Sequence, residues 1–338
     1  MRPIILDVEG YCLTAVEQEY LAHPLVAGVI LFTRNFDNVV QLKELVQQIR
    51  LHAKNDLIIA VDHEGGRVQR FRDGFTILPA CGDLLSKTSS VEQAMRLAKA
   101  SAFVMASELI DCDIDLSFAP VLDINGISDV IKERAFSHDK YQVSQMASAY
   151  IDGMKLAGMS STGKHFPGHG SVKADSHIAL PVDGRSEIEI FTNDMLPFVE
   201  LINNNKLEAI MPSHVVYSEC DTLPCGFSEY WLQKILKQKL GFKGTIISDD
   251  ISMHGASFVG NHLSRAINAV NAGCDLILAC NDQKAAMSIL DGLTINNKSN
   301  ELLISSLLAD KKKLSLPLLK NQSWLESRRL LLEFAERV

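Results

Sequence analysis

Eight short apolar segments recur along the chain, and each ends in a polar or small residue or is followed by one. Longer segments with helical spacing lie between them, for example at 39–54, 92–110 and 264–273. The apolar segments are IILD (4–7), GVILF (28–32), LIIAVD (57–62), DLSFAPVLD (115–123), STGKHF (161–166), LEAIMPSH (207–214), GTIISD (244–249) and DLILAC (275–280). Continuous apolar strands that alternate with amphipathic helices indicate an α/β fold with parallel strands buried on both faces.

Eight such strands in a chain of 338 residues favour a (β/α)8, TIM-type barrel. An open doubly wound sheet is the alternative, but the glycine-rich dinucleotide fingerprint that often marks one is missing. The GHG at 168–170 lacks the third glycine, and no ribose-binding acid is placed downstream. The sequence has no linker rich in Pro, Gly or Ser, so we expect one domain over 1–338. The helical, charged segment from about 290 to 338 is expected to pack on the outside of the barrel.

The composition restricts the partners. The net charge of −8 disfavours nucleic acid and anionic membranes. The sequence has no run of eighteen apolar residues, and its first apolar segment is too short for a signal peptide, so we expect a cytoplasmic protein. The seven cysteines fit reduced thiols in that compartment. The expected partner is a small molecule, and the expected state is a monomer or a weak homodimer.

Chemically active side chains follow the apolar segments, where a barrel of this type places its active site. They are Asp62, Arg134, Lys164, His165, Ser213, His214, Asp249, Asp250, Asn281 and Asp282. The densest stretch is KHFPGHGSVKADSH at 164–177, which carries three histidines, two lysines and an aspartate. Such a stretch is poor core material, and it therefore predicts a functional loop after the fifth strand.

Several of these residues also have a purely structural interpretation. Strand-terminal aspartates such as Asp62 and Asp123 can be helix N-caps, and we favour that interpretation for Asp250. His214 can hold a loop, and His169 can brace one. Of the remaining candidates, His63 and Glu64 can serve the turn at Gly65-Gly66, and we assign no role to His254.

A metal site is the sharpest rival, because five side chains could be ligands: His165, His169, Asp175, His177 and His214. Barrel metallohydrolases commonly place a His-x-His pair after the first strand, and this chain has ILDVEG there. The spacing within 165–177 is also that of a loop and not of an i, i+4 helical pair. We therefore predict no metal and no other cofactor.

Two motifs carry a resemblance to a known family. KHFPGHGSVKADSH and IISDDISMHGA (246–256) closely resemble glycoside hydrolase family 3, and within it the single-domain bacterial β-N-acetylglucosaminidases of cell-wall recycling. The similarity reaches to about residue 290 through AGVILFTRNF (27–36), AVDHEGGRVQRF (60–71), FAPVLDIN (118–125), ERAFSHD (133–139), IMPSHVVY (210–217) and NAGCDLILACN (271–281). It implies a (β/α)8 barrel and a retaining mechanism.

The resemblance also implies roles for individual residues. Asp249 matches the family's nucleophile, and His177 with Asp175 matches its acid/base dyad. The positions that match sugar-binding residues are Asp62, Arg70, Arg134, Lys164 and His165. The implied substrates carry a non-reducing β-linked N-acetylglucosamine, notably its disaccharide with 1,6-anhydro-N-acetylmuramic acid and the corresponding muropeptides.

The sequence leaves two further functions open. A phosphorylase would pass the glycosyl group from Asp249 to phosphate, and a histidine acid/base lacks the negative charge that would repel phosphate. A non-catalytic sugar sensor would keep the sugar-binding residues and lose Asp249 or His177. Both of these residues are present, which argues against the sensor.

Overall fold

The computed structural model describes residues 1–173, 180–295, 299–314 and 316–337. The strands are β1 (Ile4–Asp7), β2 (Val26–Leu31), β3 (Ile58–Val61), β4 (His63–Gly65), β5 (Val68–Gln69), β6 (Leu116–Ser117), β7 (Thr162–Phe166), β8 (Val182–Asp183), β9 (Ala209–Pro212), β10 (Val216–Tyr217), β11 (Thr245–Ile246) and β12 (Ile277–Leu278). The α-helices are α1 (Ala15–Leu21), α2 (Val39–His52), α3 (Cys81–Ser86), α4 (Val91–Asp111), α5 (Lys140–Ala157), α6 (Glu187–Thr192), α7 (Leu196–Asn203), α8 (His262–Ala272), α9 (Gln283–Gly292), α10 (Glu301–Leu307) and α11 (Gln322–Ala335).

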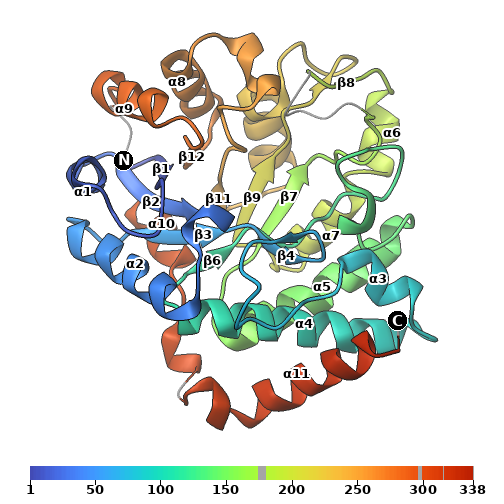
Figure 1. Cartoon of the computed structure of the whole chain (residues 1–338). Coiled ribbons are helices and arrows are strands. Elements are labelled where there is room, and N and C mark those ends of the chain that lie inside the picture. Colours follow the sequence, from blue (N-terminus) through green and yellow to red (C-terminus); the bar gives the residue numbers. More distant parts are fainter. Residues whose placement is uncertain (174–179, 296–298, 315, 338) are drawn as a thin grey trace.

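The parallel strands close into a barrel. One sheet has the order β12-β1-β2-β3-β6, and a second has the order β11-β9-β7. Two parallel bridges join the sheets, one between Val121 and Lys164 and one between Ile247 and Leu276. Figure 1 shows the strands side by side with helices around them. The eight barrel strands fall within or overlap the eight apolar segments, so the predicted (β/α)8 barrel is confirmed and the open sheet is wrong.

Some barrel strands are shorter than their apolar segments. The segment at 115–123 contributes only β6, because Pro120 has no N–H to donate to a neighbouring strand. Backbone pairing with β7 follows, because Ala119 O accepts from Thr162 N at 2.7 Å and Leu122 N donates to Lys164 O at 2.7 Å. The barrel wall is therefore continuous at the point where the two sheets meet.

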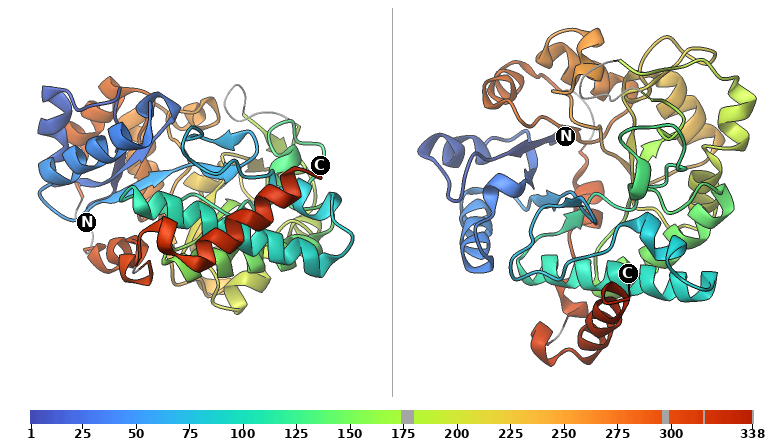
Figure 2. Two further views of the ribbon diagram at one scale, coloured as in Figure 1. Left: turned by 60° about the horizontal axis from the view of Figure 1, so that its bottom comes forward. Right: turned by 45° about the vertical axis from the view of Figure 1, so that its right-hand side comes forward.

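The outer helices bury one apolar stripe each. Helix α2 buries Leu42, Leu45, Val46 and Ile49, the spacing of a single helical face, and Asn38 caps its N-terminus by accepting from Gln41 N. Helix α4 is buried on more than one side because α5 and α11 both contact it (Figure 2). In the described residues, no helix has the length and apolarity needed to cross a membrane.

Helix α10 closes the end of the barrel at which the strands begin. Its side chains Ile304 and Leu307 are buried in the same apolar cluster as Ile5 and Phe118 of the barrel interior. Asn300, which precedes α10, accepts from Arg2 N at 2.9 Å and donates to Arg2 O at 2.9 Å. The C-terminal segment thus supplies part of the barrel core as well as α11, which lies across α4 on the outside (Figure 2).

Candidate active site

A cavity of about 270 Å³ opens at the carboxyl ends of the barrel strands. The strands β3, β7, β11 and β12, together with the segments that follow them, supply polar side chains to its wall. Six residues with a predicted catalytic or sugar-binding role line it: Asp62, Arg70, Arg134, Lys164, His165 and Asp249. The structure therefore brings together, in one cavity, residues that are up to 187 positions apart in the chain, from Asp62 to Asp249.

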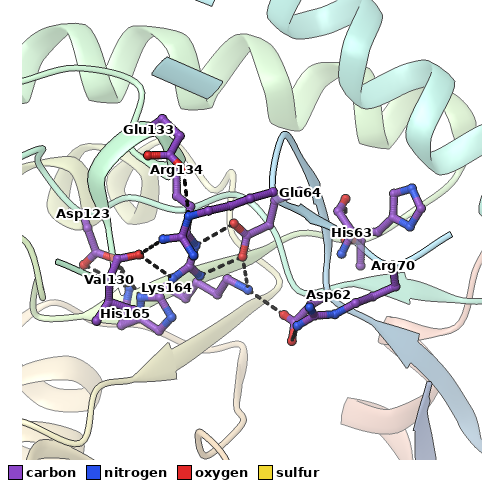
Figure 3. Close-up of polar contacts among 12 residues, drawn as sticks. Asp62, His63, Glu64, Arg70, Asp123, Val130, Glu133, Arg134, Lys164 and His165 are labelled. Carbon is purple, nitrogen blue, oxygen red and sulfur yellow. Dashed lines mark hydrogen bonds and ion pairs between the residues drawn. The ribbon is translucent and has the colours of Figure 1, made fainter. Parts of the chain in front are cut away.

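Lys164 lies at the centre of a buried ionic cluster (Figure 3). Its side chain is only 2% exposed, and Nζ lies 2.7 Å from Asp62 Oδ1 and 2.7 Å from Glu64 Oε1. Burial by itself would lower the pKa of Lys164, but the two carboxylates outweigh it and hold the pKa above its ordinary value. Lys164 is therefore a charged hydrogen-bond donor in the wall of the cavity.

Arg134 makes a two-pronged ion pair with the same glutamate. Its Nε donates to Glu64 Oε2 at 2.9 Å, and its Nη2 donates to Glu64 Oε1 at 2.8 Å. Burial opposes ionisation of Glu64, yet Arg134 and Lys164 hold the pKa of this carboxyl well below its usual range. Glu64 is therefore an anion between two cations at any pH near neutrality.

Asp62 and Arg70 form the other side of the cluster. Arg70 Nη2 lies 3.6 Å from Asp62 Oδ2, and Arg70 Nε is a buried donor with no hydrogen-bond partner in the described residues. An orphaned donor costs free energy unless a ligand satisfies it. Its place in the cavity wall fits the predicted role of Arg70 in sugar binding.

Asp123 contacts two histidines, His165 on β7 and His169 in the loop that follows. Its Oδ2 lies 2.7 Å from His165 Nδ1, and its Oδ1 accepts from the backbone N–H of His169 at 2.6 Å. Burial favours a neutral Asp123, but His165 overrides it, so the pKa of Asp123 lies below its ordinary value of 3.8. The interpretation of Asp123 as a helix N-cap is wrong, because Oδ2 contacts His165 on β7 and Oδ1 contacts His169 in the loop that follows.

A close backbone approach shapes this loop. A Cβ at Gly170 would lie 1.7 Å from Ile124 O, so only glycine lets the loop pack against the segment after Asp123. His169 lies beside it in the cavity wall, and both of its ring nitrogens are buried without a partner in the described residues. Burial lowers the pKa of His169, which makes it a neutral ring that a ligand could contact.

Asp249 and Asp250 follow β11 and have different environments. Asp249 lines the cavity, and its Oδ1 accepts from Asp250 N at 2.8 Å. The Asp250 carboxylate accepts from Ser252 N at 2.8 Å, from Ser252 Oγ at 2.7 Å and from Asn281 Nδ2 at 2.9 Å. Asp250 therefore stabilises a turn. The interpretation of Asp250 as a helix N-cap is wrong, because the next helical segment is a 3₁₀-helix at His254–Val259 whose N-cap is Met253.

His214 supports the same turn from the barrel side. Its Nε2 lies 3.0 Å from Asp250 O, and its ring stacks on Phe227 with centroids 5.3 Å apart. Burial lowers the pKa of His214, so the ring is neutral and structural. The interpretation of His214 as a residue that holds a loop agrees with these contacts.

The structure corrects the interpretation of Glu64. The turn needs Gly65 and Gly66, both at positive φ, while Glu64 contacts Lys164 and Arg134 and His63 packs against Phe71. One signal in the sequence could have identified Glu64. Residues two apart in extended chain face the same side, so the spacing of Asp62 and Glu64 is that of two side chains that point the same way.

The remaining predicted catalytic residues, Asp175 and His177, lie outside the described residues. The described parts on either side of 174–179 are anchored to one aspartate. Ser171 Oγ donates to Asp194 Oδ1 at 3.1 Å, and Arg185 Nη1 donates to Asp194 Oδ2 at 2.8 Å.

Of the predicted ligands of the rival metal site, Asp175 and His177 lie outside the described residues. Across residues 1–173, 180–295, 299–314 and 316–337, no three His, Cys, Asp or Glu side chains are grouped so that they could hold a metal ion. His165 is engaged by Asp123, and His214 contacts the backbone of Asp250.

The chain is similar to known proteins along most of its length. The model of the glycosyl hydrolase family 3 N-terminal domain matches residues 5–306. A beta-hexosaminidase of Psychromonas ingrahamii is 62% identical over 337 residues, which cover 100% of both chains. A beta-hexosaminidase of Haemophilus influenzae is 52% identical over 295 residues, covering 87% of this chain and 84% of that protein.

Solved structures are similar to this chain as well. Native NagZ from Neisseria gonorrhoeae superposes with a TM-score of 0.91 at 39% identity and covers 98% of this chain and 97% of that one. The same protein in complex with N-trifluoroacetyl-D-glucosamine also gives a TM-score of 0.91, at 40% identity, over 98% and 97% of the two chains. The comparisons confirm the resemblance and the predicted enzyme class, a glycoside hydrolase of the β-N-acetylhexosaminidase type. The chain belongs to glycosyl hydrolase family 3.

Proposed function

We propose that this protein is a retaining exo-β-N-acetylglucosaminidase that removes one non-reducing sugar through a covalent adduct on Asp249. The observation that carries the proposal is the position of Asp249 in the wall of the cavity that holds the buried Asp62–Lys164–Glu64–Arg134 cluster. Sugar hydroxyls need several fixed charged donors and acceptors, and this cluster supplies them. The names of the relatives, beta-hexosaminidases, support an N-acetylhexosamine as the sugar.

The volume of the cavity supports exo cleavage. At about 270 Å³ it lies at the small end of ligand sites, which suits one sugar residue better than an oligosaccharide. The departing group would then lie outside the cavity. From the resemblance, we propose that it is 1,6-anhydro-N-acetylmuramic acid or its peptides, in cytoplasmic cell-wall recycling, and that the enzyme is a monomer or a weak homodimer.

The proposed mechanism has two steps. In the first, an Asp249 oxygen attacks the anomeric carbon as the glycosidic C–O bond breaks, and His177 gives its proton to the departing oxygen. In the second, His177 takes a proton from water, which attacks the same carbon and releases Asp249. An imidazole suits both transfers because its ordinary pKa of about 6.5 lies near neutrality. Asp175 would orient the ring and stabilise its charged form, as the carboxylate of a serine-protease triad does.

Trapping of the adduct tests this proposal. A fluorinated analogue of the sugar that keeps the 2-acetamido group and has a good leaving group slows the second step, so the glycosyl-enzyme accumulates and its peptide can be mapped by mass spectrometry. We expect the label on Asp249. A label on Asp250 or Asp62 would contradict the proposed nucleophile.

Product analysis distinguishes hydrolysis from phosphorolysis. A β-N-acetylglucosaminide is incubated with and without inorganic phosphate, and the sugar products are identified. We expect free N-acetylglucosamine at the same rate in both samples. Formation of the sugar 1-phosphate, with a rate that rises with phosphate, would show the phosphorylase instead.

A further inference from the structure

Glu64 is the one member of the ionic cluster that does not line the cavity as the structure describes it. Its side chain is 3% exposed and lies behind Arg134 and Lys164, both of which do line it. We propose that Glu64 is the positioning residue of the sugar site, which fixes Arg134 and Lys164 relative to each other without touching the sugar. This inference rests on the proposed function, because that proposal assigns the two cations to sugar binding.

The hydrogen-bond geometry supports this role. Glu64 Oε1 receives both Arg134 Nη2, at 2.8 Å, and Lys164 Nζ, at 2.7 Å, and Oε2 receives Arg134 Nε at 2.9 Å. A single shared oxygen therefore sets the distance between the two cationic groups. The paired contact also fixes the plane of the guanidinium, which a single contact would leave free to rotate.

A count of donors shows what remains for a ligand. An ammonium group has three N–H donors, and Asp62 and Glu64 take two of those on Lys164. Among the described residues, the Nη1 of Arg134 has only a long contact of 3.4 Å, with Val130 O. Each cation therefore keeps a donor for a ligand, while its contact with Glu64 fixes its position (Figure 3).

The balance of charge adds a second requirement. Arg134 and Lys164 are buried beside each other, and Glu64 and Asp62 are the anions that contact them. The other titratable groups near Glu64 are Cys81 and Tyr150, and burial keeps both neutral by raising their pKa values. Removal of the charge of Glu64 would leave Arg134 and Lys164 beside each other, with Asp62 as the remaining anion of the cluster. Either one of the two side chains would then move, or Lys164 would lose its proton.

Glu64→Gln tests the role with little change of shape, and Glu333→Gln is its matched control. Glu333 pairs with Arg329 at 2.8 Å on the exposed face of α11, so the control removes the same charge from an Arg–Glu pair away from the cavity. We expect Glu64→Gln to raise KM and the Kd for N-acetylglucosamine roughly 10- to 100-fold, as for one broken buried charge pair, with a smaller change in kcat. The control should match the wild type.

The pH profile gives a readout that a purely structural role would not move. Because Glu64 helps to hold the proton on Lys164, we expect the alkaline limb in the pH profile of the Kd for N-acetylglucosamine, which does not depend on proton transfer by His177, to shift to lower pH in Glu64→Gln. Glu64→Asp keeps the charge and withdraws the carboxylate by one methylene. It should therefore keep an alkaline limb close to that of the wild type while KM remains raised, and it serves as the test if Glu64→Gln does not fold.

The outcomes separate the two proposals. If the wild type does not hydrolyse β-N-acetylglucosaminides, the proposed function fails, and this inference fails with it. If the wild type is active and Glu64→Gln keeps its KM, Kd and pH profile within about twofold of the control, only the positioning role is overturned. An equal loss of kcat and kcat/KM with an unchanged pH profile would also overturn it, because general destabilisation would explain that result.

Discussion

Asp123 and His165 form a buried pair in which the carboxylate Oδ2 lies 2.7 Å from the ring Nδ1. Because Asp123 is ionised, Nδ1 carries a proton and donates to it, which fixes the orientation of the ring. His165 lines the cavity, so its Nε2 can contact a sugar hydroxyl. Strand β7 therefore supplies two neighbouring polar side chains, Lys164 and His165, to the cavity wall.

We expect Asp123→Asn to weaken sugar binding. Asparagine has one acceptor oxygen, whereas Asp123 takes the ring of His165 and the backbone N–H of His169 on two different oxygens. One buried donor would lose its partner, at about 1–3 kcal/mol or roughly 5- to 150-fold in kcat/KM. Steady-state kinetics on an aryl N-acetylglucosaminide measure this loss. A variant that is folded and fully active would show that the pair does not orient His165.

The depressed pKa values of Asp123 and Glu64 predict an acid limit to stability. Burial opposes both shifts, and it is outweighed by contacts with His165 and His169 for Asp123 and with Arg134 and Lys164 for Glu64. A group whose pKa is lower in the folded state stabilises the fold above its unfolded pKa, which is about 4 for a carboxyl group. That stability is lost as the pH falls from there through the folded pKa. Melting temperatures measured from pH 7 to pH 2 should be flat at first and then fall below about pH 4, and Asp123→Asn should show a smaller fall.

The leaving group should separate His177 from Asp249. Protonation matters most when a basic sugar alkoxide departs, and it matters little for a nitrophenolate. General-acid catalysis is worth roughly 10²–10⁴-fold. We therefore expect His177→Ala to reduce kcat/KM far more on the natural disaccharide than on the aryl glycoside. Asp249→Ala should abolish both reactions, because attack at the anomeric carbon is always needed.

Asp175→Ala should reproduce the His177→Ala pattern more weakly, because Asp175 would act only through the imidazole. An equal loss on both substrates in His177→Ala would make His177 a sugar-binding residue. His169, buried in the cavity wall with unpartnered ring nitrogens, would then be the next candidate for the acid.

Helix α10 offers a stability test with its own control. Leu307 is fully buried against the barrel interior, whereas Leu302 on the same helix is 86% exposed. Leu307→Ala should cost about 2–5 kcal/mol of unfolding free energy, because it leaves a cavity in a closed core. Leu302→Ala should change stability by less than about 0.5 kcal/mol. Denaturant unfolding measures both, and equal effects would show that α10 does not close the barrel in solution.

The barrel could be predicted because its signal is local. Each strand is a continuous apolar run, and the residue that ends it, such as Asp62 or Asp249, lies at the same end of the barrel by construction. The role of Asp123 could not be predicted in this way. A strand-terminal aspartate looks the same whether it caps a helix or holds a histidine 42 residues later.

The closure by α10 was not predictable for a similar reason. Its apolar residues, such as Ile304 and Leu307, have the same spacing as those of a surface helix. The sequence shows which face is apolar but not whether it covers the outside of the barrel or fills its end. The expectation that the C-terminal segment packs on the outside describes α11 and not α10.

Closure of the barrel by α10 also has a consequence for synthesis of the protein. Translation proceeds from the N-terminus, so all eight barrel strands are made before residues 301–307 reach solution. Until then, α10 does not cover the apolar interior around Ile5 and Phe118 at the end of the barrel where the strands begin. Ribosomes that stall or terminate after β12 would release a chain with this surface open, which is a target for chaperones and a site for aggregation. The C-terminal tenth of the chain, which contains α10, is therefore needed to complete the core that the preceding residues form.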